Sequence, residues 1–239
     1  GSIDFTCCGD ADTEGVYFSF YGSDGQNIVP LNIGAGNGSF LLPVREGEDG
    51  VQEVIAEEVK KVFALPDENC YPLELMLDNQ KENILLFTKE NDKLVFRCIK
   101  KDTMQETVKA ELCDFPEGVE IKQADLYEEE LFLFMNDDMM CYFRRADGSF
   151  EPQITANFGE NGPRVSYYLL EYDWDYKDGK LAFLCEEDAH YQASVYMFVF
   201  SENGTEYKAH FGNYGDYEND YGIPMIYLKE DEPLKIWFE

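Results

Sequence analysis

The sequence predicts an all-β fold built from a repeated four-stranded unit. The first observation is a recurring hairpin pattern. VYMFVFSENGTEYKAHFG at 195–212 has two apolar, partly alternating runs joined by an Asn-Gly turn, and similar patterns occur at 16–33, 94–111 and 139–156. The second is the aromatic content: 15% of the residues are aromatic, with 18 Phe and 16 Tyr, and such residues favour strands.

Each hairpin places its turn at the same point, and most hairpins follow a second type of strand pair. The turns are expected at Asp24-Gly25, Asp102-Thr103, Asp147-Gly148 and Asn203-Gly204. Three hairpins come directly after two apolar strands joined by an acidic turn, and a fourth such pair has no hairpin after it. These opening pairs are 73–87, 121–134, 168–184 and 224–238.

The repeats over about residues 16–33 and 71–239 resemble those of β-propellers in general. No GH…WD signature, kelch double glycine or aspartate box points to a particular family. The resemblance implies four blades (alternatively five) of four antiparallel strands, in a ring closed by terminal strands that share one blade. Residues 16–22 should then pair with residues 234–238. An open β-sandwich is the structural alternative.

One stretch departs from the repeat. Residues 51–65, VQEVIAEEVKKVFAL, carry apolar residues at helical spacing and stop before Pro66, which predicts a helix. We therefore interpret 34–70 as an insertion that contains this helix and 1–14 as an N-terminal tail. The chain as a whole, 1–239, is expected to be a single propeller-like domain.

Charge is the strongest compositional bias. The chain has 49 acidic and 19 basic residues, a formal net charge of −30. A field of that sign repels phosphate backbones and anionic lipids, so binding to nucleic acid or to a membrane surface is not expected. No apolar run approaches the roughly 18 residues of a membrane span. The field favours cationic partners such as Ca²⁺ or basic proteins, or serves solubility alone.

The seven cysteines show no zinc-binding spacing. Cys98, Cys113, Cys141 and Cys185 lie in apolar runs and are expected to be buried free thiols, with a 98–113 disulfide as the alternative. The chain opens on Gly-Ser without a methionine, so we expect an export signal or lipid-attachment cysteine to have been removed and the protein to be extracellular or at the cell surface. The oligomeric state is left open.

Two acidic-aromatic loops, at 172–178 and 214–221, form the main candidate site. Their rings offer flat apolar faces with polar rims, their carboxylates can accept sugar hydroxyls, and alternating carboxylates suit Ca²⁺. The candidate ligand-binding residues are Tyr172, Trp174, Tyr176, His190, Tyr214 and Tyr217. The candidate calcium ligands are Asp173, Asp175, Asp216, Glu218 and Asp220. The alternative is that the rings pack between blades while the acids solvate turns.

Signals for catalysis are weak. The chain has only two histidines, His190 and His210, and it lacks a GxSxG element. The Gly-rich segment at 34–38 has no lysine of a phosphate-binding loop. The sequence therefore favours a non-catalytic binding or scaffold protein that recognises a protein or glycan partner. A carbohydrate-active enzyme (glycosidase or lyase) that uses carboxylates and a calcium-stabilised structural domain are the alternatives.

Overall fold

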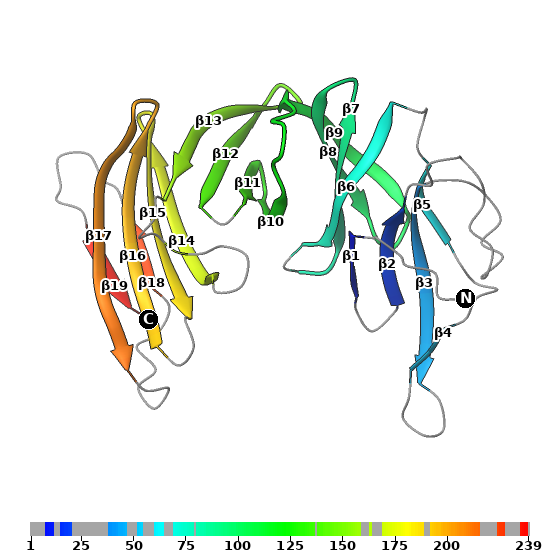
Figure 1. The fold of residues 1–239 in the computed structure, drawn as a ribbon, viewed down its shortest axis with the longest axis horizontal. Coiled ribbons are helices and arrows are strands. Elements are labelled where there is room, and N and C mark those ends of the chain that lie inside the picture. The colour runs from blue at the N-terminus through cyan, green and yellow to red at the C-terminus, as the bar shows by residue number, and fades with distance from the viewer. Residues whose placement is uncertain are drawn as a thin grey trace. The chain divides into compact units, whose positions relative to one another are not determined.

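The computed structural model shows strands as its only regular elements within the residues that it describes, which confirms the all-β prediction (Figure 1). The described residues are 8–11, 15–20, 38–46, 52–54, 60–64, 69–78, 80–136, 138–158, 163, 169–188, 192–215, 224–227 and 235–238. None of these segments forms a helix with the length and hydrophobicity needed to cross a membrane. The chain divides into two compact units, one of residues 1–118 with 146–150 and one of residues 119–145 with 151–239.

Three four-stranded antiparallel sheets follow one another along the chain, each with its strands side by side in sequence order. Sheet I consists of β6 (Cys70–Leu77), β7 (Asn83–Glu90), β8 (Lys93–Lys100) and β9 (Gln105–Asp114). Sheet II consists of β10 (Ile121–Tyr127), β11 (Glu130–Met135), β12 (Met139–Ala146) and β13 (Ser149–Asn157). Sheet III consists of β14 (Leu169–Lys177), β15 (Lys180–Asp188), β16 (Gln192–Ser201) and β17 (Gly204–Gly215).

These sheets confirm the repeated unit in three copies, since each joins a predicted opening pair to a predicted hairpin. The Asp147-Gly148 turn is confirmed, with positive φ angles of 49° and 88° at its two residues. The turn between β16 and β17 falls one residue earlier than expected, because Gly204 is already the first residue of β17. The predicted Asp24-Gly25 turn lies outside the described residues.

A fourth region, the N-terminal sheet, stands in place of the predicted tail and insertion. It consists of β1 (Cys8–Ala11), β2 (Gly15–Phe20), β3 (Gly38–Glu46), β4 (Gln52–Val54) and β5 (Lys60–Ala64). β1 pairs with β2 and β2 with β3, while β4 and β5 both pair with β3. Residues 8–11 of the predicted N-terminal tail therefore belong to this sheet as strand β1.

The predicted helix over 51–65 is also wrong, because β4 and β5 occupy its described residues as strands. Val62 is buried beside Leu41 of β3, and Lys60 and Lys61 are exposed. The helical spacing of the apolar residues was ambiguous over so short a stretch. The β-branched side chain of Val62 suits the pleated surface beside β3.

The predicted pairing of residues 16–22 with 234–238 is contradicted as well. β2 already has β1 on one edge and β3 on the other, so it has no free edge for a third strand. The predicted strand pair at 224–238 does form, as β18 (Pro224–Tyr227) and β19 (Lys235–Phe238) in antiparallel register. β18 lies beside β14 and β15 of sheet III.

The central strands of sheets I to III are covered on both faces. Side chains are buried without interruption over 84–88 in β7, 131–135 in β11 and 181–185 in β15. Successive side chains of a strand point to opposite faces, so each uninterrupted run requires a packed layer on both sides. Sheets with this property stack face to face, which is consistent with a propeller-like all-β fold.

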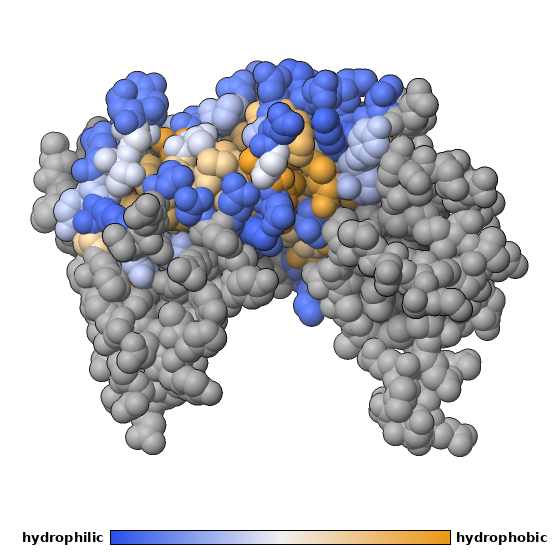
Figure 2. Space-filling view, viewed as in Figure 1, coloured by the Kyte–Doolittle hydropathy of each residue, from blue (hydrophilic) through white to orange (hydrophobic). Residues whose placement is uncertain are grey.

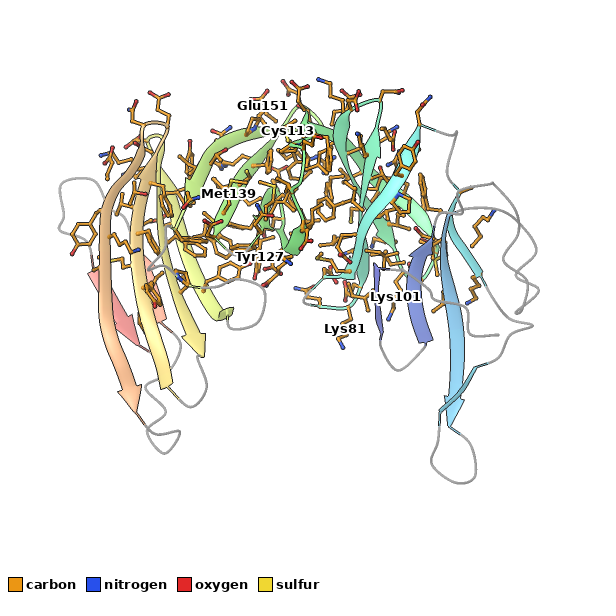
Figure 3. The ribbon with its side chains drawn as sticks, viewed as in Figure 1. Lys81, Lys101, Cys113, Tyr127, Met139 and Glu151 are labelled. Atoms are coloured by element: carbon orange, nitrogen blue, oxygen red, sulfur yellow. The ribbon has the colours of Figure 1, made fainter. Side chains whose placement is uncertain are left out.

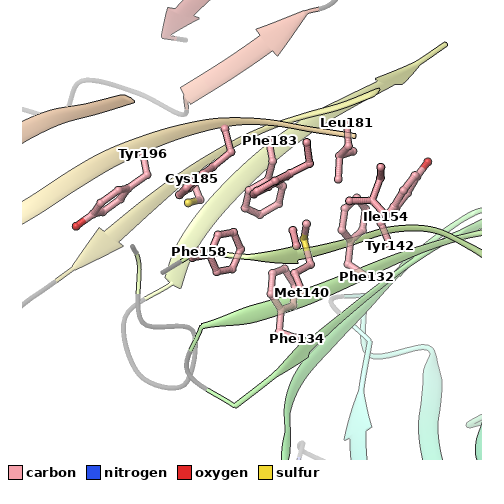
Figure 4. Close-up of a cluster of buried hydrophobic side chains, with 13 residues drawn as sticks. Phe132, Phe134, Met140, Tyr142, Ile154, Phe158, Leu181, Phe183, Cys185 and Tyr196 are labelled. Carbon is pink, nitrogen blue, oxygen red and sulfur yellow. The ribbon is translucent and has the colours of Figure 1, made fainter. Parts of the chain in front are cut away.

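In each unit, two sheets pack face to face through a cluster of buried side chains. In the second unit, sheets II and III pack through an aromatic-rich cluster (Figure 4). Its members include Phe132, Phe134, Met140, Tyr142, Phe158, Leu181, Phe183, Cys185, Tyr196, Phe198 and Phe200. In the first unit, the N-terminal sheet packs on sheet I through a smaller, aliphatic cluster. This cluster is made by Leu41, Val62, Leu75, Leu77, Ile84, Leu86 and Ile99.

The prediction of buried thiols is confirmed for Cys98, Cys141 and Cys185, whereas Cys113 is only half-buried. None of these four cysteines forms a disulfide, so the alternative 98–113 disulfide is absent, and Cys70 is a further buried thiol. These thiols pack as small apolar groups in and beside the cores.

Truncating the Phe132 ring should strongly destabilise the second unit. Phe132→Ala removes a fully buried ring from the cluster between sheets II and III, and we expect the free energy of unfolding to fall by about 3–5 kcal/mol. Urea unfolding followed by tryptophan fluorescence measures this, because Trp174 and Trp237 both belong to the second unit. Glu129→Ala, at an exposed turn position, is the control and should change stability by less than about 0.5 kcal/mol. Equal effects of the two substitutions would contradict this packing.

Candidate functional site

The first acidic-aromatic segment is a strand, which corrects the prediction of a loop at 172–178. β14 continues to Lys177, and only Asp178 and Gly179 form the turn into β15. Tyr172, Trp174 and Tyr176 alternate along this strand and therefore share one face.

This face of β14 points toward sheet II. The three aromatic residues are partly buried and pack against the cluster between sheets II and III. Asp173 and Asp175 lie on the opposite face, opposite Leu184 and Ala182 of β15. Strand alternation thus separates the predicted ligand-binding rings from the predicted calcium ligands.

Each of the three rings on β14 places its polar end on an acceptor in sheet II. The Tyr172 hydroxyl donates a hydrogen bond to the Asp125 carboxylate. Trp174 Nε1 donates to Glu130 Oε2 at 2.9 Å. The Tyr176 hydroxyl donates to Gln153 Oε1 at 3.0 Å. The acceptors come from β10, β11 and β13, so this one strand is tied across the width of its neighbouring sheet.

Burial keeps the tyrosine hydroxyls protonated in this contact. Burial first, and then the charge of Asp125, raises the pKa of Tyr172 well above its ordinary value. Burial and a 2.6 Å hydrogen bond to Glu130 Oε1 likewise raise the pKa of Tyr142. Both phenols therefore remain donors at neutral pH, and their carboxylate acceptors receive charge-assisted hydrogen bonds.

Packing of the rings completes the contact. The Trp174 ring centroid lies 4.4 Å from that of Tyr127 and 4.7 Å from that of Phe132. Tyr127 belongs to β10 of sheet II (Figure 3). The neighbouring sheet therefore engages both the rings and the polar ends of Tyr172 and Trp174. This agrees with the alternative expectation that these rings pack between sheets.

The remaining predicted site residues lie mostly beyond the described part of the chain. Tyr214 lies in β17 opposite Ala193, and its side chain is outside the description. The residues outside the described ranges are His190, Asp216, Tyr217, Glu218 and Asp220. In the described ranges, no three His, Cys, Asp or Glu side chains gather as a metal site would require. Calcium binding at these positions stays a prediction.

Tyr176 is the predicted residue that reaches an open cavity, which we call the turn cavity. It has a volume of about 510 Å³ and lies where the β14–β15 and β16–β17 turns of sheet III meet β13 of sheet II. Its lining consists of Pro152, Gln153, Tyr176, Asp178, Gly179, Lys180, Ser201, Glu202, Asn203 and Glu206. Hydrophilic side chains cover this end of sheet III in the surface view (Figure 2).

The rest of this lining was not predicted, although the sequence carries a signal for it. In a four-stranded meander the first and third turns lie at the same end of the sheet, because successive strands reverse direction. The predicted turns near Asp178 and Asn203 should therefore be neighbours. The turn residues of the hairpins are thus a sequence-level indication of the cavity's position.

Polar contacts fix the walls of the turn cavity. Tyr176 is held by its bond to Gln153, and its ring lies 5.4 Å from the Arg144 guanidinium carbon. Lys180 Nζ and Glu206 Oε2 form an ion pair at 2.6 Å. Hydrogen bonds from Lys180 and Ser201 lower the pKa of Glu206. The cavity is thus lined by groups that already have defined positions.

A second polar cluster, which the sequence analysis also missed, surrounds Arg97 in the first unit. Arg97 interrupts the apolar run of β8 and is only 2% exposed. Its Nη1 lies 2.5 Å from Glu90 and donates to Thr88 at 2.7 Å, and its guanidinium lies 4.5 Å from the Phe63 ring centre. Its Nε lies 3.0 Å from the Glu106 carboxylate, at an angle that does not make a hydrogen bond.

The Arg97 cluster stabilises the fold and offers no reactive group. Burial and the Glu90 charge raise the pKa of the Cys70 thiol to about 12, so this thiol is not a nucleophile at neutral pH. Burial alone would raise the pKa of Glu90, but hydrogen bonds from Arg97 and Thr88 and the Arg97 charge outweigh it and lower that pKa to about 2. The cluster holds an ion pair between β7 and β8 of sheet I, and the Phe63 ring of the N-terminal sheet packs on its guanidinium.

Comparison with known proteins identifies no family. No protein-family model matches the chain, and no curated protein matches it. Similar solved structures include the hydrazine synthase of Kuenenia stuttgartiensis, with 9% identity over 83% of this chain and 46% of that one and a TM-score of 0.35. A Bacteroides fragilis protein described as a 6-phosphogluconolactonase has 14% identity over 90% and 57%, with a TM-score of 0.34. Hsv2 of Kluyvelomyces marxianus has 10% identity over 83% and 82%, with a TM-score of 0.38. Likenesses this distant say nothing about function.

The Glu90–Arg97 pair should make stability depend on acid pH. The folded pKa of Glu90 is about 2 against an ordinary value of 4.5, so its stabilising contribution is present above pH 4.5 and is lost as the pH falls toward 2. We expect this acid-dependent loss to be about 1–3 kcal/mol smaller in Glu90→Gln than in the wild type. Urea unfolding by circular dichroism between pH 2 and 7 measures it. Glu111→Gln, at an exposed position on β9, is the control and should behave like the wild type. If Glu90→Gln has the same pH profile as the wild type, the stabilising role of the Glu90–Arg97 pair is refuted.

Proposed function

We propose that the chain is a non-catalytic binding or scaffold protein that recognises a protein or glycan partner around the turn cavity. The observation that carries this proposal is the cavity itself, which is open, about 510 Å³ in volume and walled by Tyr176 and two adjacent turns. Ligand sites in proteins span about 300–1,000 Å³. Loops positioned by a rigid sheet are also where binding residues are usually found.

The chemistry of the lining is suited to recognition. The lining has no cysteine or histidine, and its three carboxylates are Asp178, Glu202 and Glu206, of which Glu206 is held in an ion pair with Lys180. Its tyrosine hydroxyl is engaged with Gln153, and its lysine is paired with Glu206. Groups engaged in this way are suited to holding a ligand in place.

We also infer that the fold is a β-propeller of five blades. The N-terminal sheet and sheets I to III each have the width of a four-stranded blade, and β18 and β19 supply the first two strands of another. Burial of the central strands on both faces supports the interpretation of each sheet as one blade of a stack. An experimental structure would test this directly, and any blade count other than five would overturn it.

Binding at the turn cavity can be tested with two arrays. We expect the chain to bind members of either a glycan array or a peptide array, and Asn203→Arg to weaken that binding at least tenfold, because the new side chain would occupy the cavity mouth. Thr103→Arg adds the same side chain to an exposed turn of sheet I and should leave binding unchanged.

Two results would contradict the proposal. The first is the absence of any saturable binder on both arrays. The second is a set of binders whose affinities do not change in Asn203→Arg, which would place the binding surface elsewhere on the chain.

A further inference from the structure

We propose that the turn cavity binds a neutral saccharide of one or two sugar rings. This inference rests on the proposed binding function and names the ligand class for the same site. The volume of the cavity, the chemistry of its lining and its charge each restrict the class of ligand that it can bind.

Volume and polarity together favour a small hydrophilic ligand. At about 510 Å³ the cavity is larger than a single amino-acid side chain would fill. Most ligand pockets are lined mainly by apolar groups. Here seven of the ten lining residues have polar or charged side chains in addition to Tyr176. A ligand that displaces water from such a lining must replace the hydrogen bonds that the lining groups made to water. Molecules rich in hydroxyl groups can do this.

The apolar part of the lining suits the C–H face of a sugar ring. Tyr176 and Pro152 supply it. The Tyr176 ring is fixed in orientation by the Gln153 hydrogen bond and by the Tyr142 ring, whose centroid is 5.2 Å away. A ring already held in place loses little conformational freedom when a ligand stacks on it.

The charges of the lining exclude anionic ligands. The carboxylates of Asp178, Glu202 and Glu206 face one ammonium group, that of Lys180, which is already paired. The chain as a whole carries a net charge of −30. Phosphorylated sugars and uronic acids would be repelled. Neutral hydroxyls, by contrast, can donate to these carboxylates.

The Asn203 side-chain amide favours a saccharide over a basic side chain of a partner protein. It carries both donors and an acceptor, which matches hydroxyl groups that also do both, whereas the Gln153 amide is already engaged by the Tyr176 hydroxyl and the Glu151 carbonyl. A lysine or arginine can only donate, so it would leave the Asn203 amide donors without partners. It would also occupy only part of the volume.

The test is calorimetric titration of the full chain with defined probes. These are glucose, galactose, mannose, N-acetylglucosamine, lactose, cellobiose, glucuronic acid and an acetylated arginine amide. We expect saturable binding of at least one neutral sugar and at least tenfold weaker binding of glucuronic acid than of glucose, if glucose binds. Asp178→Asn and Glu202→Gln should each weaken sugar binding about tenfold, which corresponds to one hydrogen bond to a charged group.

The variants are chosen to leave the fold intact. Asp178 has a φ of 51°, a conformation that asparagine tolerates well. Glu151→Gln is the matched control, because it makes the same charge change on β13, next in sequence to the lining residue Pro152, without itself lining the cavity. It should leave sugar binding unchanged, and thermal melting should show all three variants folded like the wild type.

The remaining outcomes separate the two proposals. Binding of the arginine amide without any sugar, weakened by the same variants, overturns the saccharide assignment and leaves the binding function. Sugar binding that is unchanged in both cavity variants overturns the site. A third outcome combines no calorimetric signal from any sugar with an array ligand whose binding is weakened by Asn203→Arg. This outcome overturns the saccharide assignment and leaves the binding function in place. Blank arrays overturn both proposals.

Discussion

The contact between β14 and sheet II is the interaction on which the second unit depends. One strand supplies three aromatic side chains to the same face, and each ring contributes both apolar area and one hydrogen-bond donor. Asp125, the acceptor for Tyr172, is only 2% exposed, and a buried carboxylate without donors would be strongly destabilising. The rings therefore donate hydrogen bonds to the polar groups of the interface and also fill its volume. The register of sheet III against sheet II follows from this pairing of specific donors with specific acceptors.

This contact also defines the turn cavity. Tyr176 is the last of the three aromatic residues before the Asp178-Gly179 turn, so the row of rings ends where the cavity begins. The inner members of the row, Tyr172 and Trp174, hold the sheets together, and the outermost one also lines an opening to solvent. A cavity wall built this way is rigid, because the same bonds that stabilise the unit also fix the wall.

The repeated strands could be predicted from sequence, because the alternation of the hairpins and their turn residues are local signals. The N-terminal region could not. Residues 60–64 satisfy a helical pattern, and only the edge of β3, more than a dozen residues away, makes them a strand. The candidate site shows the same division. Alternating aromatics in 172–176 were visible, but whether their face meets a partner molecule or a neighbouring sheet depends on Asp125 and Glu130, some 45 residues earlier.

The coupling between Tyr172 and Asp125 tests the central claim most directly. A double-mutant cycle with Tyr172→Phe, Asp125→Ala and the combined variant, followed by urea unfolding, isolates the energy that the two side chains share. If the polar ends of the β14 rings hold sheets II and III together, the coupling free energy should be about 1–3 kcal/mol. Effects that add to within about 0.5 kcal/mol would contradict the account, because the aromatic row would then stabilise the unit by ring packing alone.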